Sequence, residues 1–138
     1  MKRPILRPLD PSKTCELYTD AARTSLSAIL IQSEDEERKN KYVIAYASKT
    51  LIPRQRKYPI IELELMAVYF GLCKFEQWVY GRKVEVYSDH RPLQWLNSLS
   101  RHNPRLARWN LTIQRFNIST TYIPGKFQIA DGLTRLHE

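Results

Sequence analysis

Four acidic residues of this sequence stand at positions from which they could hold metal ions together: Asp20, Glu64, Asp89 and Asp131. Asp20 and Asp89 each end a run typical of a β-strand. Glu64 lies in a long helical pattern, and Asp131 lies near the C-terminus. Carboxylate oxygens are the ligands that Mg²⁺ prefers in proteins, and a pair of Mg²⁺ ions held in this way can cleave a phosphodiester. The pattern therefore predicts a two-metal site for phosphodiester chemistry.

The composition is that of one basic domain. The chain has 138 residues, 43% of them hydrophobic, which is enough to bury a core without disulfides. A net charge of +8 and a pI of about 9.7 favour a polyanionic partner such as nucleic acid, although a basic surface that serves only solubility would have the same composition. The two cysteines, Cys15 and Cys73, stand in apolar contexts. That placement argues against a disulfide framework or a zinc site and suits a reducing compartment.

The start of the chain predicts an extended arm followed by three strands. Pro4, Pro8 and Pro11 exclude regular structure before about residue 13, so we expect an arm over 1–13 and one domain over 14–138. We see no secretory signal pattern, and the longest apolar run, 65–73, is too short to cross a bilayer. The β-rich runs are 15–21, 25–33 and 42–48, with the charged residues 34–41 expected as a hairpin loop.

The segment 60–79 has the clearest helical pattern. Its apolar stripe consists of Ile61, Leu65, Val68, Leu72, Phe75 and Val79. Projection at about 100° per residue puts Glu64 at the border of this stripe and points Glu62 toward solvent. A carboxylate beside the buried face can reach the edge of an underlying sheet, so Glu64 rather than Glu62 is the candidate ligand. The alternative for Glu64 is an ion pair at the surface of the helix.

The rest of the chain predicts two strands and three helices. In chain order these are a strand at 84–89, a short helix at 92–99, an amphipathic helix at 104–116, a strand at 118–123 and a helix at 127–136. The apolar stripe of the amphipathic helix consists of Leu106, Trp109, Ile113 and Phe116. A neighbouring basic stripe contains Arg105, Arg108 and Arg115, with Arg101 just upstream. Such a stripe can track phosphates, or it can be an ordinary solvated face.

The order of these elements, with eight short motifs along it, resembles the ribonuclease H domain of gypsy-class long-terminal-repeat retrotransposon polyproteins. The motifs are YTDAA at 18–22, IAYASKTL at 44–51, ELELMAV at 62–68, YGRK at 80–83, SDHRPL at 88–93, RLARW at 105–109, YIPGK at 122–126 and ADGLTR at 130–135. The arm resembles the joint between reverse transcriptase and this domain. The resemblance covers nearly the whole chain and implies an RNase H-like α/β fold, in which a five-stranded mixed sheet is flanked by helices.

The resemblance implies hydrolysis of the RNA strand of an RNA–DNA hybrid. The family's catalytic, metal-binding carboxylates carry over onto Asp20, Glu64, Asp89 and Asp131. Asp20 would bridge two Mg²⁺ ions, with Mn²⁺ as the alternative metal; Glu64 and Asp89 would share one ion, and Asp131 would bind the other. Arg101, Arg105 and Arg108 are the expected phosphate contacts. The implied partners are the hybrid and the reverse transcriptase and integrase domains of a parent polyprotein, with no membrane. The implied location is inside the cell: the cytoplasm, a virus-like particle or the nucleus.

Three functions stay open at the level of sequence. The first is an active ribonuclease H of a retroelement, or of a host gene derived from one. The second is a domesticated, inactive domain that binds nucleic acid or a protein partner; the presence of all four carboxylates argues against it. The third is a DNA-directed nuclease or integrase of the same fold, which the helical carboxylate and the continuous resemblance disfavour.

Overall fold

The computed structural model describes residues 6–34, 37, 40–88 and 100–122 of the chain. The strands are β1 (Cys15–Ala21), β2 (Ser25–Ser33), β3 (Lys41–Thr50), β4 (Lys83–Ser88) and β5 (Asn117–Tyr122). The helices are the 3₁₀ turn η1 (Gln55–Lys57), α1 (Ile60–Lys74), α2 (Glu76–Val79) and α4 (Pro104–Ile113). The predicted helices at 92–99 and 127–136 lie outside the described residues.

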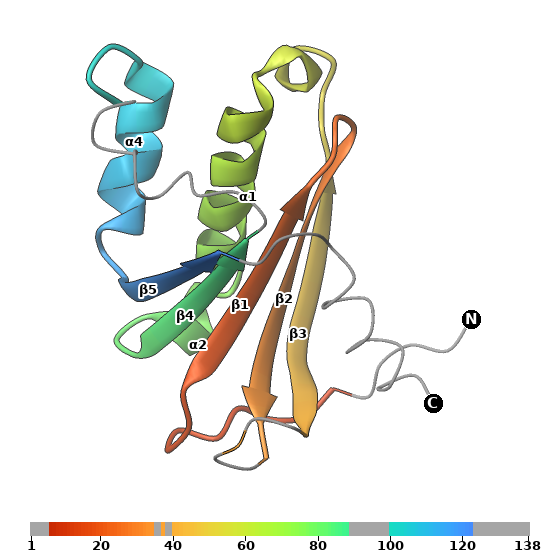
Figure 1. Cartoon of the computed structure of the whole chain (residues 1–138), viewed down its shortest axis with the longest axis vertical. Coiled ribbons are helices and arrows are strands. Elements are labelled where there is room, and N and C mark those ends of the chain that lie inside the picture. The colour runs from red at the N-terminus through yellow and green to blue at the C-terminus, as the bar shows by residue number, and fades with distance from the viewer. Residues whose placement is uncertain (1–5, 35–36, 38–39, 89–99, 123–138) are drawn as a thin grey trace.

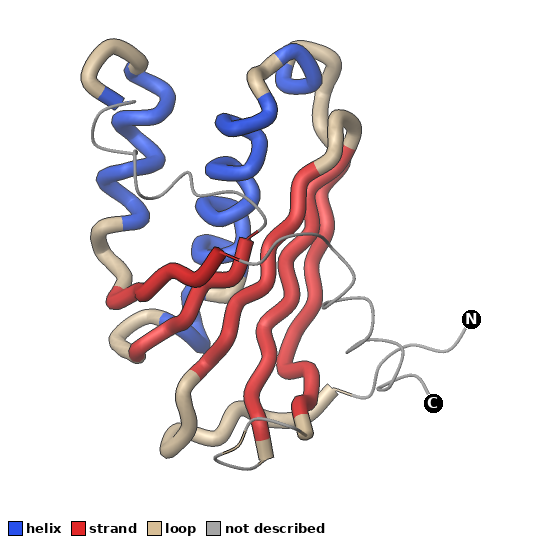
Figure 2. The backbone as a smooth tube through the Cα atoms, viewed as in Figure 1, coloured by secondary structure: helices blue, strands red, loops and turns tan. Residues whose placement is uncertain are grey.

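The strands form one mixed sheet in the order β3-β2-β1-β4-β5. β1, β2 and β3 are antiparallel neighbours, whereas β4 pairs parallel to β1 and β5 pairs parallel to β4. Figure 1 shows α1 crossing this sheet, and Figure 2 shows the helices gathered on one side of the strands. The predicted α/β fold with a five-stranded mixed sheet is confirmed.

The helix predicted over 60–79 is divided into two. α1 ends at Lys74, and α2 begins at Glu76 after Phe75 adopts φ −103° and ψ 19°. Phe75 is buried, so the break turns its ring into the core and lets α2 leave in a new direction. The alternating apolar spacing continues through the break, which is why the sequence pattern alone did not reveal it.

The main core lies between the sheet and the layer formed by α1 and α4. The four apolar residues of the stripe predicted over 104–116, namely Leu106, Trp109, Ile113 and Phe116, are all buried in it, although α4 ends at Ile113 and Phe116 lies beyond it. α4 begins where expected, because Asn103 accepts hydrogen bonds from the backbone N–H groups of Arg105 and Leu106, and Pro104 opens the first turn. This cap fixes the start of α4 beside α1. None of the helices in the described ranges is long and apolar enough to cross a membrane.

The N-terminal arm lies along the outer edge of β3. Leu6 forms an isolated parallel bridge with Val43, and the Arg7 N–H donates to the Val43 carbonyl at 3.0 Å. Further along, the Gln32 side chain accepts from the Asp10 N–H and donates to the Asp10 carbonyl. These contacts hold the described part of the arm against the sheet.

Gly71 marks the point where α1 crosses β1 and β2. A Cβ atom at this position would lie 3.0 Å from the Ala28 Cβ and 3.3 Å from the Leu17 methyl groups. The Ala28 Cβ is fixed to the backbone of a central strand, so it cannot rotate out of the way. We expect Gly71→Val to lower the free energy of unfolding by about 3 kcal/mol or more, because overpacking forces the helix off the sheet.

Urea titration of Gly71→Val beside Gly71→Ala tests this close contact. The alanine variant should lose less, because alanine favours the helix over glycine by about 1 kcal/mol and so offsets part of the clash. Wild-type stability of the valine variant would contradict the contact.

Candidate active site and basic groove

Asp20 lies at the penultimate position of β1, at the end of the sheet. Its Oδ1 accepts a hydrogen bond from the Ala21 N–H at 3.0 Å, and its side chain is partly exposed. Alternation along the strand puts Asp20 on the same face as Tyr18, whose ring belongs to a small cluster opposite α1. Asp20 is therefore an accessible carboxylate at a strand end, as predicted.

A buried polar network precedes Asp20 on that face. The Glu16 carboxylate is buried and accepts hydrogen bonds from Tyr18, Ser33 and Lys41. The Tyr18 ring stacks on Tyr87 of β4, with ring centroids 4.7 Å apart. Burial and the neighbouring Glu16 raise the pKa of the Tyr18 hydroxyl, so it stays protonated and donates to that carboxylate. The network holds β1 and β4 together just before the end that carries Asp20.

Glu64 faces the sheet from α1 and is buried, with 1% of its surface exposed. Glu64 precedes Gly71 by seven residues, which is about two helical turns, so both lie on the same side of α1. Gly71 packs against Leu17 and Ala28 of the sheet, and Glu64 therefore faces the sheet as well. The predicted position of Glu64 beside the buried face is confirmed.

Asp20 and Glu64 lie at the same level of the sheet. Starting from the contact between Gly71 and Leu17, Glu64 is about 10 Å back along α1, and Asp20 is about 10 Å forward along β1. The two elements run in opposite directions, so both displacements lead to the same end of the sheet (Figure 1). The carboxylates approach this end from the two faces of β1.

The other two predicted ligands, Asp89 and Asp131, lie outside the described residues. Within the described ranges, no group of three or more His, Cys, Asp and Glu side chains could hold a metal ion. Asp89 directly follows Ser88, the last residue of β4. The structure therefore positions two of the four predicted carboxylates, Asp20 and Glu64.

Glu62 does not point into solvent, contrary to the helical projection. Its side chain is only 12% exposed, and its Oε1 accepts from the Arg105 guanidinium at 2.5 Å and from the Asn103 amide at 3.3 Å. The projection was wrong here because it considered one buried face, whereas α4 covers a second side of α1. Glu62 thus joins α1 to the start of α4.

The predicted arginines have different surroundings. Arg105 forms the ion pair with Glu62 and stacks on Tyr58, with its guanidinium carbon 3.8 Å from the ring centroid. Arg115 lies beyond the end of α4 and pairs with Glu76 at 2.9 Å. Arg108 and Arg101 are exposed, the latter in the turn before α4. Arg105 is thus largely committed to a structural role, whereas Arg108 is available to a ligand.

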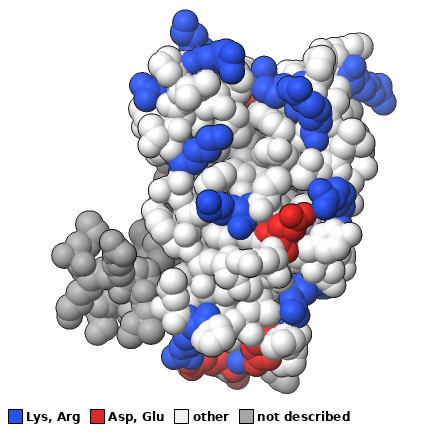
Figure 3. Space-filling model, turned by 180° about the vertical axis from the view of Figure 1, so that it is seen from behind, with Lys and Arg blue, Asp and Glu red and all other residues white. Residues whose placement is uncertain are grey.

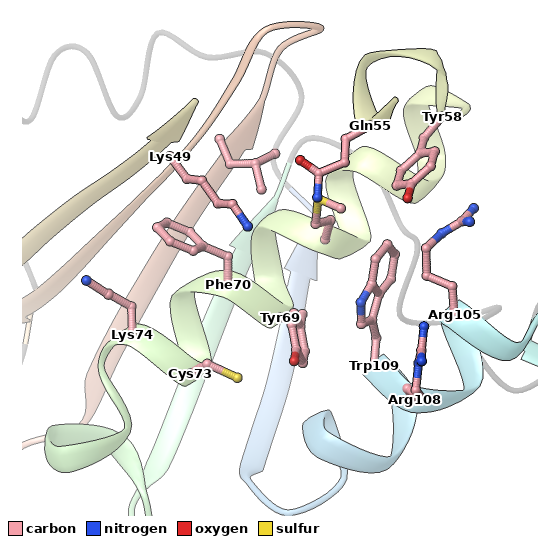
Figure 4. Close-up of a pocket in the computed structure, with 12 residues that line it drawn as sticks. Lys49, Gln55, Tyr58, Tyr69, Phe70, Cys73, Lys74, Arg105, Arg108 and Trp109 are labelled. Carbon is pink, nitrogen blue, oxygen red and sulfur yellow. The ribbon is translucent and has the colours of Figure 1, made fainter. Parts of the chain in front are cut away.

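A groove of about 430 Å³ runs over the outer side of α1. We call it the basic groove; its basic members are Lys49, Lys74, Arg105 and Arg108. Aromatic rings from α1, α4 and the segment after η1 also line it: Tyr58, Tyr69, Phe70 and Trp109. Among the described residues, no Asp or Glu lines it. Figure 3 shows Lys and Arg spread over this face of the molecule, and Figure 4 shows the lysines and arginines on opposite sides of the groove.

Two titratable groups on α1 lie in this groove. Burial raises the pKa of the Tyr69 hydroxyl and of the Cys73 thiol, so both are protonated at neutral pH. Cys73 is exposed and free, whereas Cys15, the other free cysteine, is buried. Cys73 is therefore an accessible thiol at the groove.

Sequence reasoning anticipated Arg105 and Arg108 but missed the remainder of this groove. Lys49 is at the end of β3, Tyr58 follows η1, and Lys74 ends α1. Residues from separate elements carry no common spacing, so only the packing of α4 against α1 reveals that they share a surface.

The chain matches a known family over most of its length. Residues 10–116 fit the model of the RNase H-like domain found in reverse transcriptase. The Retrovirus-related Pol polyprotein from transposon 297 of Drosophila melanogaster is 34% identical over 137 residues, which is 99% of this chain and 12% of that polyprotein. The Transposon Tf2-3 polyprotein of Schizosaccharomyces pombe is 33% identical over 138 residues, which is 96% of this chain and 10% of that polyprotein. The chain thus spans about a tenth of the length of these curated relatives.

Solved structures share the fold. The foamy viral protease-reverse transcriptase in complex with RNA/DNA hybrid has a TM-score of 0.65 at 21% identity, covering 86% of this chain and 16% of that one. RNase H1 from the archaeon Halobacterium salinarum has a TM-score of 0.58 at 13% identity, covering 89% and 93% of the two chains. Identities this low bear on the fold alone, which is RNase H-like.

Proposed function

This chain belongs to the family of RNase H-like domains found in reverse transcriptases, and from that membership we propose that it hydrolyses the RNA strand of RNA–DNA hybrids. The observation that carries the proposal is the position of Asp20 and the buried Glu64 at the same level of one end of the sheet. Carboxylates that come from different elements and lie at the same end of a sheet are suited to share a metal ion.

The donor set fits divalent cations that prefer oxygen. Asp20, Glu64, Asp89 and Asp131 would hold two Mg²⁺ or Mn²⁺ ions. Such a pair of ions supplies an activated water and stabilises the leaving 3′-oxygen of the RNA strand. The described register of β1 and β4 ends at the pair of Tyr18 and Tyr87, and in the sequence Asp20 and Asp89 each come two residues after this pair. That register supports Asp20 and Asp89 as neighbouring ligands.

The protein's own residues set the rigidity of this site. Glu64 is almost fully buried, so its carboxylate has little freedom to move. Asp20 is on the central strand of the sheet, next to the stacked pair of Tyr18 and Tyr87. Fixed carboxylates bind metal ions without reorganising on binding, which favours catalysis.

We propose that the domain acts as part of an intracellular retroelement reverse transcriptase, because its curated relatives are polyproteins of which it matches only a small part. A foamy viral protease-reverse transcriptase of the same fold has been solved in complex with RNA/DNA hybrid. The preceding polymerase would then hold the same hybrid that this domain cuts.

Cleavage of three labelled duplexes side by side tests the proposal. With Mg²⁺, the protein should cut the RNA of an RNA–DNA hybrid with little sequence preference, leave DNA duplex intact and cut RNA duplex poorly, because shape and the 2′-hydroxyl are what distinguish them. EDTA should stop cleavage. The assay is run with and without a fused reverse transcriptase. Efficient cleavage of DNA duplex would point to a DNA-directed nuclease or integrase. No cleavage of any duplex, with or without the fused reverse transcriptase, would point to a binding domain.

A further inference from the structure

We propose that the basic groove binds a single-stranded segment of nucleic acid, separately from the duplex at the carboxylates. The proposal rests on the proposed function only in the identity of the ligand as nucleic acid; the groove and its chemistry stand on their own residues. The phosphates would lie on the cations at the rims, and unpaired bases would lie on the rings between them.

The charge of the groove selects a polyanion. Lys49, Lys74 and Arg108 are exposed at its rims, and its described lining contains no carboxylate. Arg105 adds a fourth cation, although Glu62 already pairs with it. Because the lysines and arginines lie on opposite sides (Figure 4), a strand laid along the groove meets cations on both flanks.

The rings of the groove select bases that are not paired. The Phe70 ring lies between Lys49 and Lys74, and the Tyr69 ring lies beside Trp109, with centroids 6.0 Å apart (Figure 4). Tyr69 and Phe70 are each partly exposed, so a flat ligand can reach them. A duplex keeps its bases stacked inside, whereas a single strand can turn them onto aromatic side chains. Cations flanking exposed rings therefore fit a single strand better than a duplex.

The groove and the carboxylate site lie on opposite sides of α1. Glu64 faces the sheet, and Cys73, which lines the groove, follows it by nine residues, or about 180° around the helix. A strand in the groove would lie on the side of α1 that carries Cys73, away from Glu64. The groove therefore suits a strand that extends beyond the hybrid or a separate unpaired strand.

Binding of a fluorescein-labelled thymidine decamer, followed by anisotropy in EDTA, tests the proposal without any cleavage. Lys49→Ala, Lys74→Ala and Arg108→Ala should each weaken binding, and each should lower the slope of log affinity against log salt by about 0.7, as expected for one lost phosphate contact on a single strand. Lys83→Ala, at an exposed position that opens β4 and is outside the groove lining, is the matched control and should bind as wild type. Unchanged slopes for all three groove variants would overturn the proposal.

Stacking is tested by removing either the ring or the bases. Phe70→Leu should bind the decamer about fivefold more weakly or worse, because base–aromatic stacking contributes this much per base. An abasic decamer should bind wild type and Phe70→Leu equally, since the two changes remove the same interaction. Equal binding of thymidine and abasic decamers by wild type would exclude stacking and overturn the assignment.

The rate at which Cys73 is labelled reports whether the thymidine decamer occupies the basic groove. Iodoacetamide should label Cys73 and spare the buried Cys15, slowly at pH 7 and faster as the pH rises, because the raised pKa of Cys73 keeps the thiolate scarce. Saturating thymidine decamer should slow this labelling, whereas a glutamate decamer of similar charge should not. Equal protection by both decamers would make the groove a general anion site, and no protection would mean that the strand binds elsewhere. Because these measurements use EDTA, they can succeed even if hybrid cleavage fails.

Discussion

Asp20→Asn should lower the rate of Mg²⁺-dependent cleavage of RNA–DNA hybrid by about a thousandfold, because losing a ligand that stabilises transition-state charge by about 4 kcal/mol has this effect. Asparagine keeps the volume of the side chain and can still accept from the Ala21 N–H. The fold should therefore survive while the negative charge needed by the metal ions is gone. Single-turnover cleavage of a labelled hybrid measures the rate.

Asp10→Asn is the matched control for the loss of one carboxylate. Asp10 lies in the N-terminal arm, where hydrogen bonds from Ser12 lower the pKa of its carboxyl group. Removing that charge should leave cleavage unchanged. A second measurement separates metal binding from chemistry: Mg²⁺ should raise the melting temperature of wild type and of Asp10→Asn but raise that of Asp20→Asn much less. Wild-type cleavage by pure Asp20→Asn would exclude Asp20 from the site.

The strands could be predicted from the sequence because each one carries a local signal. The runs at 15–21 and 25–33 match β1 and β2 residue for residue. Each run contains β-branched or aromatic residues, namely Tyr18 and Thr19 in the first and Ile29 and Ile31 in the second, and a short turn separates the two runs. The sequence predicted a mixed sheet without saying which strands pair; the parallel pairing of β4 with β1 is a finding of the structure, and the helix between the two strands supplies the crossover that such pairing needs.

The features that could not be predicted depend on packing between distant segments. The direction of Glu62 depends on Asn103 and Arg105, some forty residues away, and no pattern within the α1 segment encodes them. The apolar spacing continues across the break at Phe75, so this spacing does not predict the break. The basic groove combines the ends of β3 and α1 with the outer face of α4. Local periodicity predicts which residues are buried, but not which second surface covers a helix.

The neighbouring acids Glu64 and Glu62 should separate catalysis from stability when each is changed to Gln. Glu64→Gln should lose cleavage by about a hundredfold or more, because its carboxylate faces the end of the sheet that carries Asp20. Glu62→Gln should retain cleavage but lower the free energy of unfolding by about 1–2 kcal/mol, since the hydrogen bond to the Arg105 guanidinium loses its charge on one side. Both variants are isosteric, so differences in packing do not enter the comparison.

Single-turnover cleavage at 25 °C measures the effect of each variant on catalysis, and urea titration in EDTA measures its effect on the free energy of unfolding. Arg105→Ala gives a second check on the structural pair: it should destabilise more than Glu62→Gln because it also removes the stacking on Tyr58, and the loss in the double variant should be smaller than the sum of the two single losses, because both changes break the same ion pair. Its effect on cleavage should be as small as that of Glu62→Gln. If instead Glu62→Gln abolishes cleavage and Glu64→Gln only destabilises the fold, then the helix presents Glu62 to the metal ions, and the level shared by Asp20 and Glu64 has no catalytic meaning.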